Sequence, residues 1–186
     1  DLIDVATGER IWSERYDRPT SDIIRLQNEI AINVTEKLRG TLSSPDQKRL
    51  VKNYTYNSQA YNDYLLGLYY WNKRTGPDME KSIGFYQTAV ELDPNFALAY
   101  AGMANSYVLL PSYAGTAPPE EAFPKANAAA LKALELDESL AEAHTALSYV
   151  LFNYDWDFHE SERHFSRAIA LNPNYANTYL FRGWLE

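Results

Sequence analysis

The sequence predicts a mainly helical protein, an α-α superhelix of antiparallel helix pairs preceded by a β-hairpin and one helix left from an α/β domain. Three stretches of the second half resemble one another, and they begin at Ala89, Ala133 and Ala168, at spacings of 44 and 35 residues. Small residues recur seven positions apart within the intervening helical segments, a spacing that lets two helices approach closely. The first 58 residues lack this repeat, and within them the side chains over Arg10–Asp17 alternate between two faces, as they do in a strand.

Composition and charge exclude several classes of function. The 186 residues contain no cysteine, which excludes thiol chemistry and disulfides, and they contain three histidines. The net charge is −8, and residues 59–186 carry all of it. Such an acidic region repels nucleic acids and anionic membrane surfaces. The longest apolar run, residues 65–71, is too short to span a membrane. We therefore expect that the chain neither binds nucleic acid nor inserts into a membrane. We expect its partner to be a protein or peptide that is neutral or basic.

Residues 1–57 predict a hairpin over 2–17, a helix over 22–39 and a short helix over 45–52. Thr7-Gly8 supplies the turn, since a hairpin needs a residue with positive φ there. Apolar residues recur at helical spacing through the 22–39 segment, and Gly40 ends it.

Residues 58–186 predict consecutive helices separated by tight turns. Pro94 and Pro173 each end one helix and fit the first turn of the next. A longer loop is expected around residues 111–119. The predicted helix starts are marked by three pairs of a capping residue and an acidic residue three positions later, namely Thr75 with Asp78, Ser139 with Glu142 and Asp157 with Glu160.

The repeated positions follow one pattern of aromatic, small and proline residues over two helices. The positions that carry it are Leu66-Gly67-x2-Tyr70, Ser82-x3-Tyr86 and Pro94, then Met103-Ala104-x2-Tyr107 and Ala126-x3-Ala130, then Leu147-Ser148-x2-Leu151, Ser161-x3-Phe165 and Pro173, and finally Tyr179-x2-Arg182-Gly183. This pattern resembles the tetratricopeptide repeat, a family of antiparallel helix pairs. The resemblance implies about three units plus the first helix of a truncated fourth.

The stretch Thr7-Gly8-x3-Trp12-Ser13-x2-Tyr16-Asp17 resembles the end of the TolB-like amino-terminal α/β domain of bacterial signalling proteins. In that family the domain lies between an effector, such as an adenylyl cyclase, a serine/threonine kinase or a winged-helix domain, and a run of tetratricopeptide repeats. The resemblance implies that this chain is a fragment of a larger bacterial signalling protein, in the cytoplasm or the periplasm. The identity of the effector and the compartment stay open.

Catalytic, cofactor and metal motifs are nearly absent, so no catalytic residue, cofactor or metal is predicted. His159 and His164 nearly match the H-E-x-x-H zinc motif, but a spacing of five separates them by about 140° on a helix. Asp155 and Asp157 begin like a calcium loop without its later glycine and glutamate. His144 occupies an aromatic repeat position and is interpreted as a packing residue.

The first helix of each predicted pair lines a concave groove, which makes its exposed face the candidate peptide site. No candidate position is basic, which argues against the capture of a C-terminal carboxylate that the family resemblance suggests. Asn105 and Asn153 are the side chains best suited to pair with a peptide backbone. The candidate groove residues are Tyr64, Leu68, Trp71, Ala101, Asn105, Val108, Thr145, Tyr149, Phe152, Asn153 and Asn177.

The predicted function is therefore a non-catalytic protein–protein interaction module. The alternatives are a regulatory or sensory region that controls an attached nucleotide cyclase or kinase and, more weakly, a self-assembly scaffold. Because a two-stranded hairpin has open edges, we also expect residues 1–17 to pair with a second copy of the fragment and form a homodimer.

Overall fold

A computed structural model describes residues 1–17, 23–39, 54–114 and 117–183 of the chain. The chain divides into two compact units, Asp1–Ser58 and Gln59–Glu186, and each is described by itself. The predicted short helix at 45–52 lies outside the described residues. Among the helices described, none combines the length and the hydropathy needed to cross a membrane.

The first unit opens with an antiparallel hairpin whose strands are β1 (Leu2–Ile3) and β2 (Arg10–Trp12). Gly8 adopts a φ of 72°, as the turn requires, and its amide donates to the Asp4 carbonyl at 2.8 Å. The strands are shorter than the predicted 2–17 segment. The Asp4 carboxylate accepts the amides of Ala6 and Thr7, at 2.8 and 3.1 Å, so the chain after Ile3 enters a local turn instead of extending the ladder.

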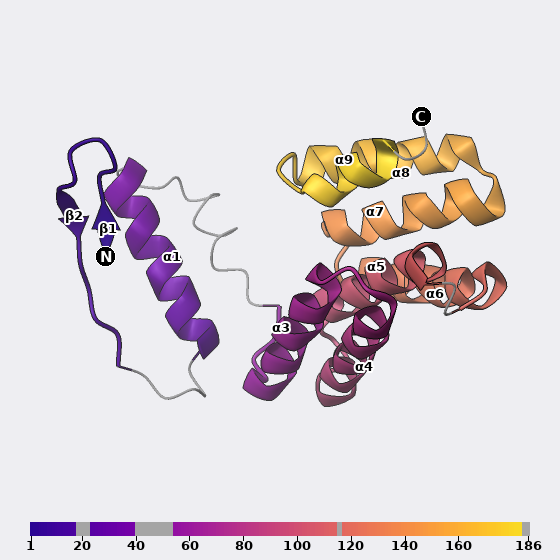
Figure 1. The fold of residues 1–186 in the computed structure, drawn as a ribbon, viewed down its shortest axis with the longest axis horizontal. Helices are drawn as coiled ribbons and strands as arrows, with labels where there is room; N and C mark the ends of the chain where they lie inside the picture. The colour runs from indigo at the N-terminus through magenta and orange to yellow at the C-terminus, as the bar shows by residue number, and fades with distance from the viewer. Residues whose placement is uncertain (18–22, 40–53, 115–116, 184–186) are drawn as a thin grey trace. The chain divides into compact units, whose positions relative to one another are not determined.

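Helix α1 (Ile23–Arg39) is joined to the segment after β2 through Asn33, whose Nδ2 donates to the Tyr16 hydroxyl at 2.9 Å and to Glu14 Oε2 at 3.4 Å. The rings of Trp12 and Tyr16 lie 6.5 Å apart, which places them on the same face of the chain. Figure 1 shows the hairpin and α1 as the two parts of this unit.

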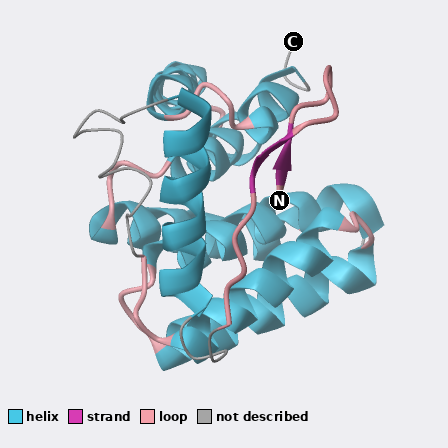
Figure 2. Ribbon diagram, turned by 90° about the vertical axis from the view of Figure 1, so that its left-hand side faces the viewer, coloured by secondary structure: helices cyan, strands magenta, loops and turns pink. Residues whose placement is uncertain are grey.

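The second unit consists of helices that follow one another in consecutive pairs (Figures 1 and 2). Helix α5 packs on α4, α6 and α7, and α7 packs in turn on α6, α8 and α9. The elements are α3 (Ser58–Asn72), α4 (Gly76–Leu92), α5 (Ala97–Ala114), α6 (Pro119–Leu136), α7 (Ala141–Val150), the π-helical turn η2 (Leu151–Asp155), α8 (Phe158–Leu171) and α9 (Ala176–Gly183).

Two of the three predicted capping pairs are confirmed. Thr75 Oγ1 accepts the Asp78 amide at the start of α4, and Asp157 Oδ1 accepts the Glu160 amide at 3.0 Å at the start of α8. The Ser139 prediction is wrong, because α7 begins after Leu140. The Ser139 hydroxyl instead donates to the carboxylate of Asp137, at 2.7 Å, in the preceding turn.

Small residues lie at the close contacts between helices, as the small-residue positions of the repeat predict. Ala104 and Ala133 are fully buried, and Gly67 lies directly against the ring of Tyr86. Ser148 and Ser161 are also buried, and each hydroxyl donates to the backbone carbonyl of the other residue. These hydroxyls satisfy their own hydrogen bonding while they let α7 and α8 approach.

Two segments differ from the sequence expectation. Helix α5 continues through Pro111 to Ala114, so the predicted loop at 111–119 is much shorter. Helix α7 passes into the π-helical turn η2, after which Trp156 adopts a left-handed φ of 59°. A π-helical turn holds more residues than an α-helical turn, so it shifts the faces presented by the residues within it.

Replacement of Ala133 by leucine tests the packing of α6. Ala133 has no exposed surface, so the larger side chain has to displace its neighbours. We expect the free energy of unfolding to fall by about 1–3 kcal/mol in denaturant titrations. Glu135→Leu, at an exposed position of the same helix, is the control and should change stability little. An unchanged stability of Ala133→Leu would contradict the repeat register.

Candidate functional site

A pocket of about 260 Å³ lies in the second unit and is formed by residues far apart in the sequence. Four aromatic side chains from three parts of the chain contribute to it: Tyr64 and Trp71 of α3, Tyr86 of α4, and Tyr175 of the turn before α9. We call it the aromatic pocket. Its remaining lining residues are Leu68, Asn72, Leu98, Gly102, Asn105, Glu142 and Asn177.

The structure brings five of the predicted groove residues together in this pocket. They are Tyr64, Leu68 and Trp71 on α3, Asn105 on α5 and Asn177 on α9. Helices α3, α5 and α9 are each the first helix of a predicted pair, so their predicted faces converge. Whether a peptide binds there stays a prediction.

The other groove candidates lie elsewhere. Ala101, Val108 and Thr145 are fully buried and Tyr149 nearly so, and their side chains pack between helices. The Thr145 hydroxyl, for example, lies 2.7 Å from that of Thr178 and joins α7 to α9.

Phe152 and Asn153 belong to η2, whose wider turn changes the face on which they lie. The ring of Phe152 packs at 4.8 Å from that of Phe158, and Asn153 Nδ2 donates to the Tyr149 carbonyl at 3.0 Å. Neither residue lines the aromatic pocket.

Sequence reasoning missed several lining residues, of which Tyr86, Glu142 and Tyr175 matter most. The sequence assigns Tyr86 to a repeat position and Glu142 to a capping pair, and neither assignment predicts contact with a ligand. Tyr175 follows the Asn-Pro-Asn turn, where the sequence predicts no ligand contact. The repeat position of Tyr86 is the one available signal, and no sequence pattern points to Glu142 or Tyr175 as lining residues.

Two buried polar atoms of the pocket residues have no hydrogen-bond partner: the indole N–H of Trp71 and Oδ1 of Asn105. The amide nitrogen of Asn105 is fully used, because it donates to the carbonyls of Ala101 at 2.8 Å and Glu142 at 3.0 Å. Trp71 is 5% exposed and Asn105 is 3% exposed. A buried polar group without a partner costs about 1–3 kcal/mol, so a ligand that supplies the missing partners is favoured.

The phenols around the pocket stay protonated at neutral pH. Burial raises the pKa of Tyr64, Tyr86 and Tyr175 above the usual value for tyrosine. The nearby carboxylate of Glu142 raises the pKa of Tyr64 and Tyr175 further. These groups therefore act as neutral hydrogen-bonding hydroxyls beside one carboxylate.

Arg74 extends from the turn between α3 and α4 to the pocket wall. Its guanidinium carbon lies 3.6 Å from the centroid of the Trp71 ring, and its Nη2 donates to Asn177 Oδ1 at 2.9 Å. The contact joins residues 103 positions apart. Arg74 also has a φ of 56°, a left-handed conformation that a residue with a side chain adopts at a cost.

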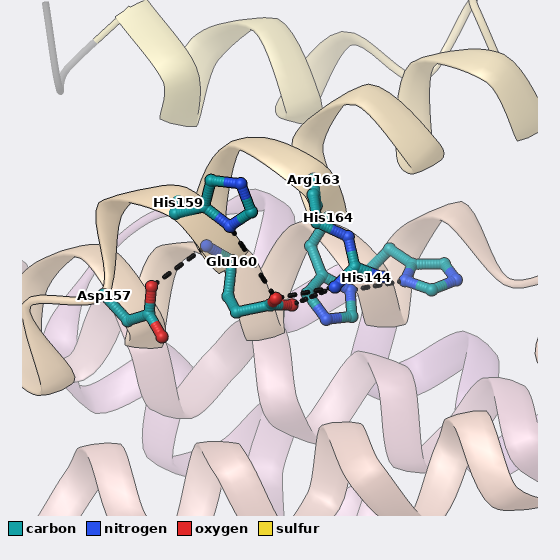
Figure 3. Close-up of polar contacts among 6 residues, drawn as sticks. All are labelled: His144, Asp157, His159, Glu160, Arg163 and His164. Carbon is teal, nitrogen blue, oxygen red and sulfur yellow. Dashed lines mark hydrogen bonds and ion pairs between the residues drawn. The ribbon is translucent and has the colours of Figure 1, made fainter.

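A second, more open depression of about 670 Å³ lies along α8 and contains all three histidines of the chain. Nδ1 of His144 lies 2.8 Å from Nδ1 of His164 (Figure 3). Nε2 of His144 lies 3.1 Å from the Glu138 carbonyl. One hydrogen bond between two imidazole nitrogens needs one donor and one acceptor, so both rings cannot be protonated while it persists. His159 is exposed, and it contacts Glu160 at 3.9 Å.

This histidine pair could not be inferred from the sequence, because the two residues lie 20 positions apart on different helices. Burial lowers the pKa of His144, and the positive charge of Arg167 adds to this while Glu138 opposes it. Burial and the charge of His144 also lower the pKa of His164, which faces Glu160 and Arg163. Among the described residues, no group of three or more histidine, aspartate or glutamate side chains is placed to hold a metal ion.

The pair predicts an acid-sensitive stability. Below the ordinary histidine pKa of 6.5 the unfolded chain binds protons that the folded pair resists, so the free energy of unfolding should fall as the pH drops from about 7 to about 5. Urea titrations across this range measure the loss. His164→Gln should make the dependence shallower, whereas His159→Gln should leave it unchanged. Equal pH profiles for the two variants would contradict the assignment.

Comparison with curated proteins finds a similarity to part of a longer bacterial protein. Over 157 residues, 81% of the chain, it is 28% identical to "Putative adenylate cyclase 3" of Rhizobium meliloti (strain 1021). The chain spans about a quarter, 26%, of the length of that relative. No family model matches the sequence. The chain is thus a mainly helical protein similar to one segment of a longer protein described as a cyclase.

Proposed function

We propose that the second unit is a non-catalytic binding module that holds a peptide segment of a partner protein in the aromatic pocket. The observation that carries this proposal is the pair of buried, unpartnered atoms, the Trp71 indole N–H and Asn105 Oδ1. A peptide backbone supplies both a carbonyl acceptor and an amide donor, which are the two groups that these atoms lack. The aromatic walls add apolar contact area for a side chain.

We also propose that the helix pairs are tetratricopeptide repeats and that the first unit is the end of a TolB-like domain. The repeated sequence positions support the first assignment, together with the consecutive packing of α4 to α9 and the buried small residues at Gly67, Ala104 and Ser148. The second rests on the segment of residues 7–17. On these two assignments we also propose that the chain belongs to a larger signalling protein.

Peptide selection on the intact chain tests the binding function. Dodecapeptides displayed on phage are enriched on the immobilised protein, and the affinity of each enriched peptide is measured by fluorescence anisotropy. Leu98→Trp fills the pocket and should weaken binding at least tenfold. Asn105→Ala should weaken it as well, because it removes the unpartnered oxygen.

The matched control is Asn153→Ala, because Asn153 also donates to a backbone carbonyl four residues earlier but lies outside the pocket. It should bind the peptides as the unaltered chain does. Thermal unfolding of each variant verifies that it is folded. Either of two results would exclude the pocket: no enriched peptide, or enriched peptides whose affinity Leu98→Trp leaves unchanged.

A regulatory role for an attached nucleotide cyclase is the second candidate, favoured by the similarity to the Rhizobium meliloti protein. In this case peptide binding at the pocket changes the activity of the full-length parent. The cyclase rate of that parent, measured with and without an enriched peptide, should change for the natural sequence and stay constant for Leu98→Trp. If the peptide changes the cyclase rate of neither protein, the regulatory role is excluded and the non-catalytic binding function remains.

Self-association through the hairpin is a separate prediction. The apolar side chains of Ile3, Val5 and Ile11 are exposed, and each of the two strands has only one partner in the hairpin. We expect the chain to sediment as a dimer at tens of micromolar and a chain that starts at Ser21 to sediment as a monomer. Two monomers would show that the hairpin edge is not an interface.

A further inference from the structure

We propose that the aromatic pocket receives a cationic side chain of the bound peptide, arginine above all, and that this guanidinium competes with Arg74 of the chain itself. The proposal rests on the proposed peptide-binding function and specifies what the pocket selects. It concerns one position of the peptide, whose backbone makes the remaining hydrogen bonds.

The pocket wall carries several acceptors, beside tyrosine hydroxyls that can donate or accept. Glu142 contributes a carboxylate, Asn105 an unpartnered buried oxygen, and Asn177 an oxygen that already accepts a guanidinium N–H. Guanidinium groups carry five N–H donors and no acceptor, so they match a wall of this kind. The unpartnered Trp71 N–H is a donor, and a backbone carbonyl of the peptide supplies its partner.

The aromatic rings favour a cation over a neutral apolar group. The face of an indole attracts a positive charge, and the attraction increases when the pair is shielded from water. Trp71 is 5% exposed, so a cation on its face is largely desolvated. The surrounding region of the chain, residues 59–186, carries the whole net charge of −8 and attracts a basic peptide from a distance.

Arg74 shows that the site accommodates a guanidinium. This group already lies on the Trp71 ring and donates to Asn177, the two contacts that an incoming arginine needs. An incoming arginine therefore replaces the contacts of the Arg74 side chain, and the displaced Arg74 side chain becomes solvated.

The experiment uses peptides from the phage selection on the intact chain. We expect them to share an arginine, and substitution of citrulline, its neutral isostere, should weaken binding at least tenfold at low salt. Raising NaCl from 50 to 500 mM should weaken the arginine peptide and leave the citrulline peptide nearly unchanged. Glu142→Gln should remove most of the difference between the two peptides, whereas Glu135→Gln, the same charge change on the exposed side of α6, should preserve it.

Arg74→Met tests the competition, because it removes the guanidinium and keeps an apolar stem. It should bind the arginine peptide several-fold more tightly than the unaltered chain does. A weaker or unchanged affinity would overturn the competition. Peptides without a basic residue, or equal affinities for the arginine and citrulline forms, would overturn the cation selectivity and leave peptide binding intact. Binding that Leu98→Trp does not affect would instead refute the pocket as the peptide site.

Discussion

Alanine at Gly102 or Gly67 is expected to lower the free energy of unfolding by about 1–3 kcal/mol, although alanine normally stabilises a helix. A Cβ atom at either position would lie 2.6 Å from the ring of Tyr86, which is 1% exposed and has little room to move. Both glycines contact the same Tyr86 ring, Gly67 from α3 and Gly102 from α5. Chemical denaturation monitored by circular dichroism measures the loss.

Gly84 of α4 supplies the matched control, because a Cβ atom there meets nothing within 4 Å. Gly84→Ala should raise the free energy of unfolding by about 0.5–1 kcal/mol. In a Tyr86→Leu background the cost of Gly102→Ala should shrink, since the smaller side chain leaves space for the added methyl group. Equal effects of alanine at Gly84 and Gly102 would contradict the close contact.

Phe181→Ala is expected to cost about 3–5 kcal/mol, the usual range for truncation of a buried phenylalanine. Phe181 has no exposed surface, and its ring centroid lies 5.1 Å from that of Tyr149 on α7. It anchors α9, the helix that carries Asn177 to the aromatic pocket. The variant should therefore lose both stability and the contact that holds Arg74.

Two measurements separate these effects. Urea titration gives the stability, and hydrogen exchange of the backbone amides of α9 reports whether that helix has detached. Tyr179→Ala is the control on the same helix, because Tyr179 is 47% exposed and should cost far less. Faster exchange in α9 for Phe181→Ala alone supports the anchoring role, and equal exchange in both variants argues against it.

Local patterns account for the features that the sequence predicted correctly. The caps at Thr75 and Asp157 depend on residues only three positions apart, so their geometry follows from the chain itself. The buried small residues, such as Ala104 and Ala133, follow from the helical period. Local reasoning failed where a neighbouring group competed, as at Ser139, whose hydroxyl bonds to Asp137 instead of capping α7.

The residues of the candidate site also divide into those that local patterns predicted and those that they did not. The sequence placed Tyr64, Trp71 and Asn105 on the helix faces that form the pocket, because the 3.6-residue period fixes those faces. It misplaced Phe152 and Asn153, since the π-helical turn η2 shifts the face and leaves no clear trace in the residue pattern.

The sequence by itself determined the mainly helical class and the caps at Thr75 and Asp157, because these depend on contacts within a few residues. Only the tertiary structure decided that Arg74 meets Trp71 and Asn177, and that His144 meets His164. Those contacts depend on how successive helices stack and on the lengths of the turns between them. A displacement of one helical turn, about 5.4 Å, exceeds the length of any hydrogen bond, so residue type and spacing alone could not establish them.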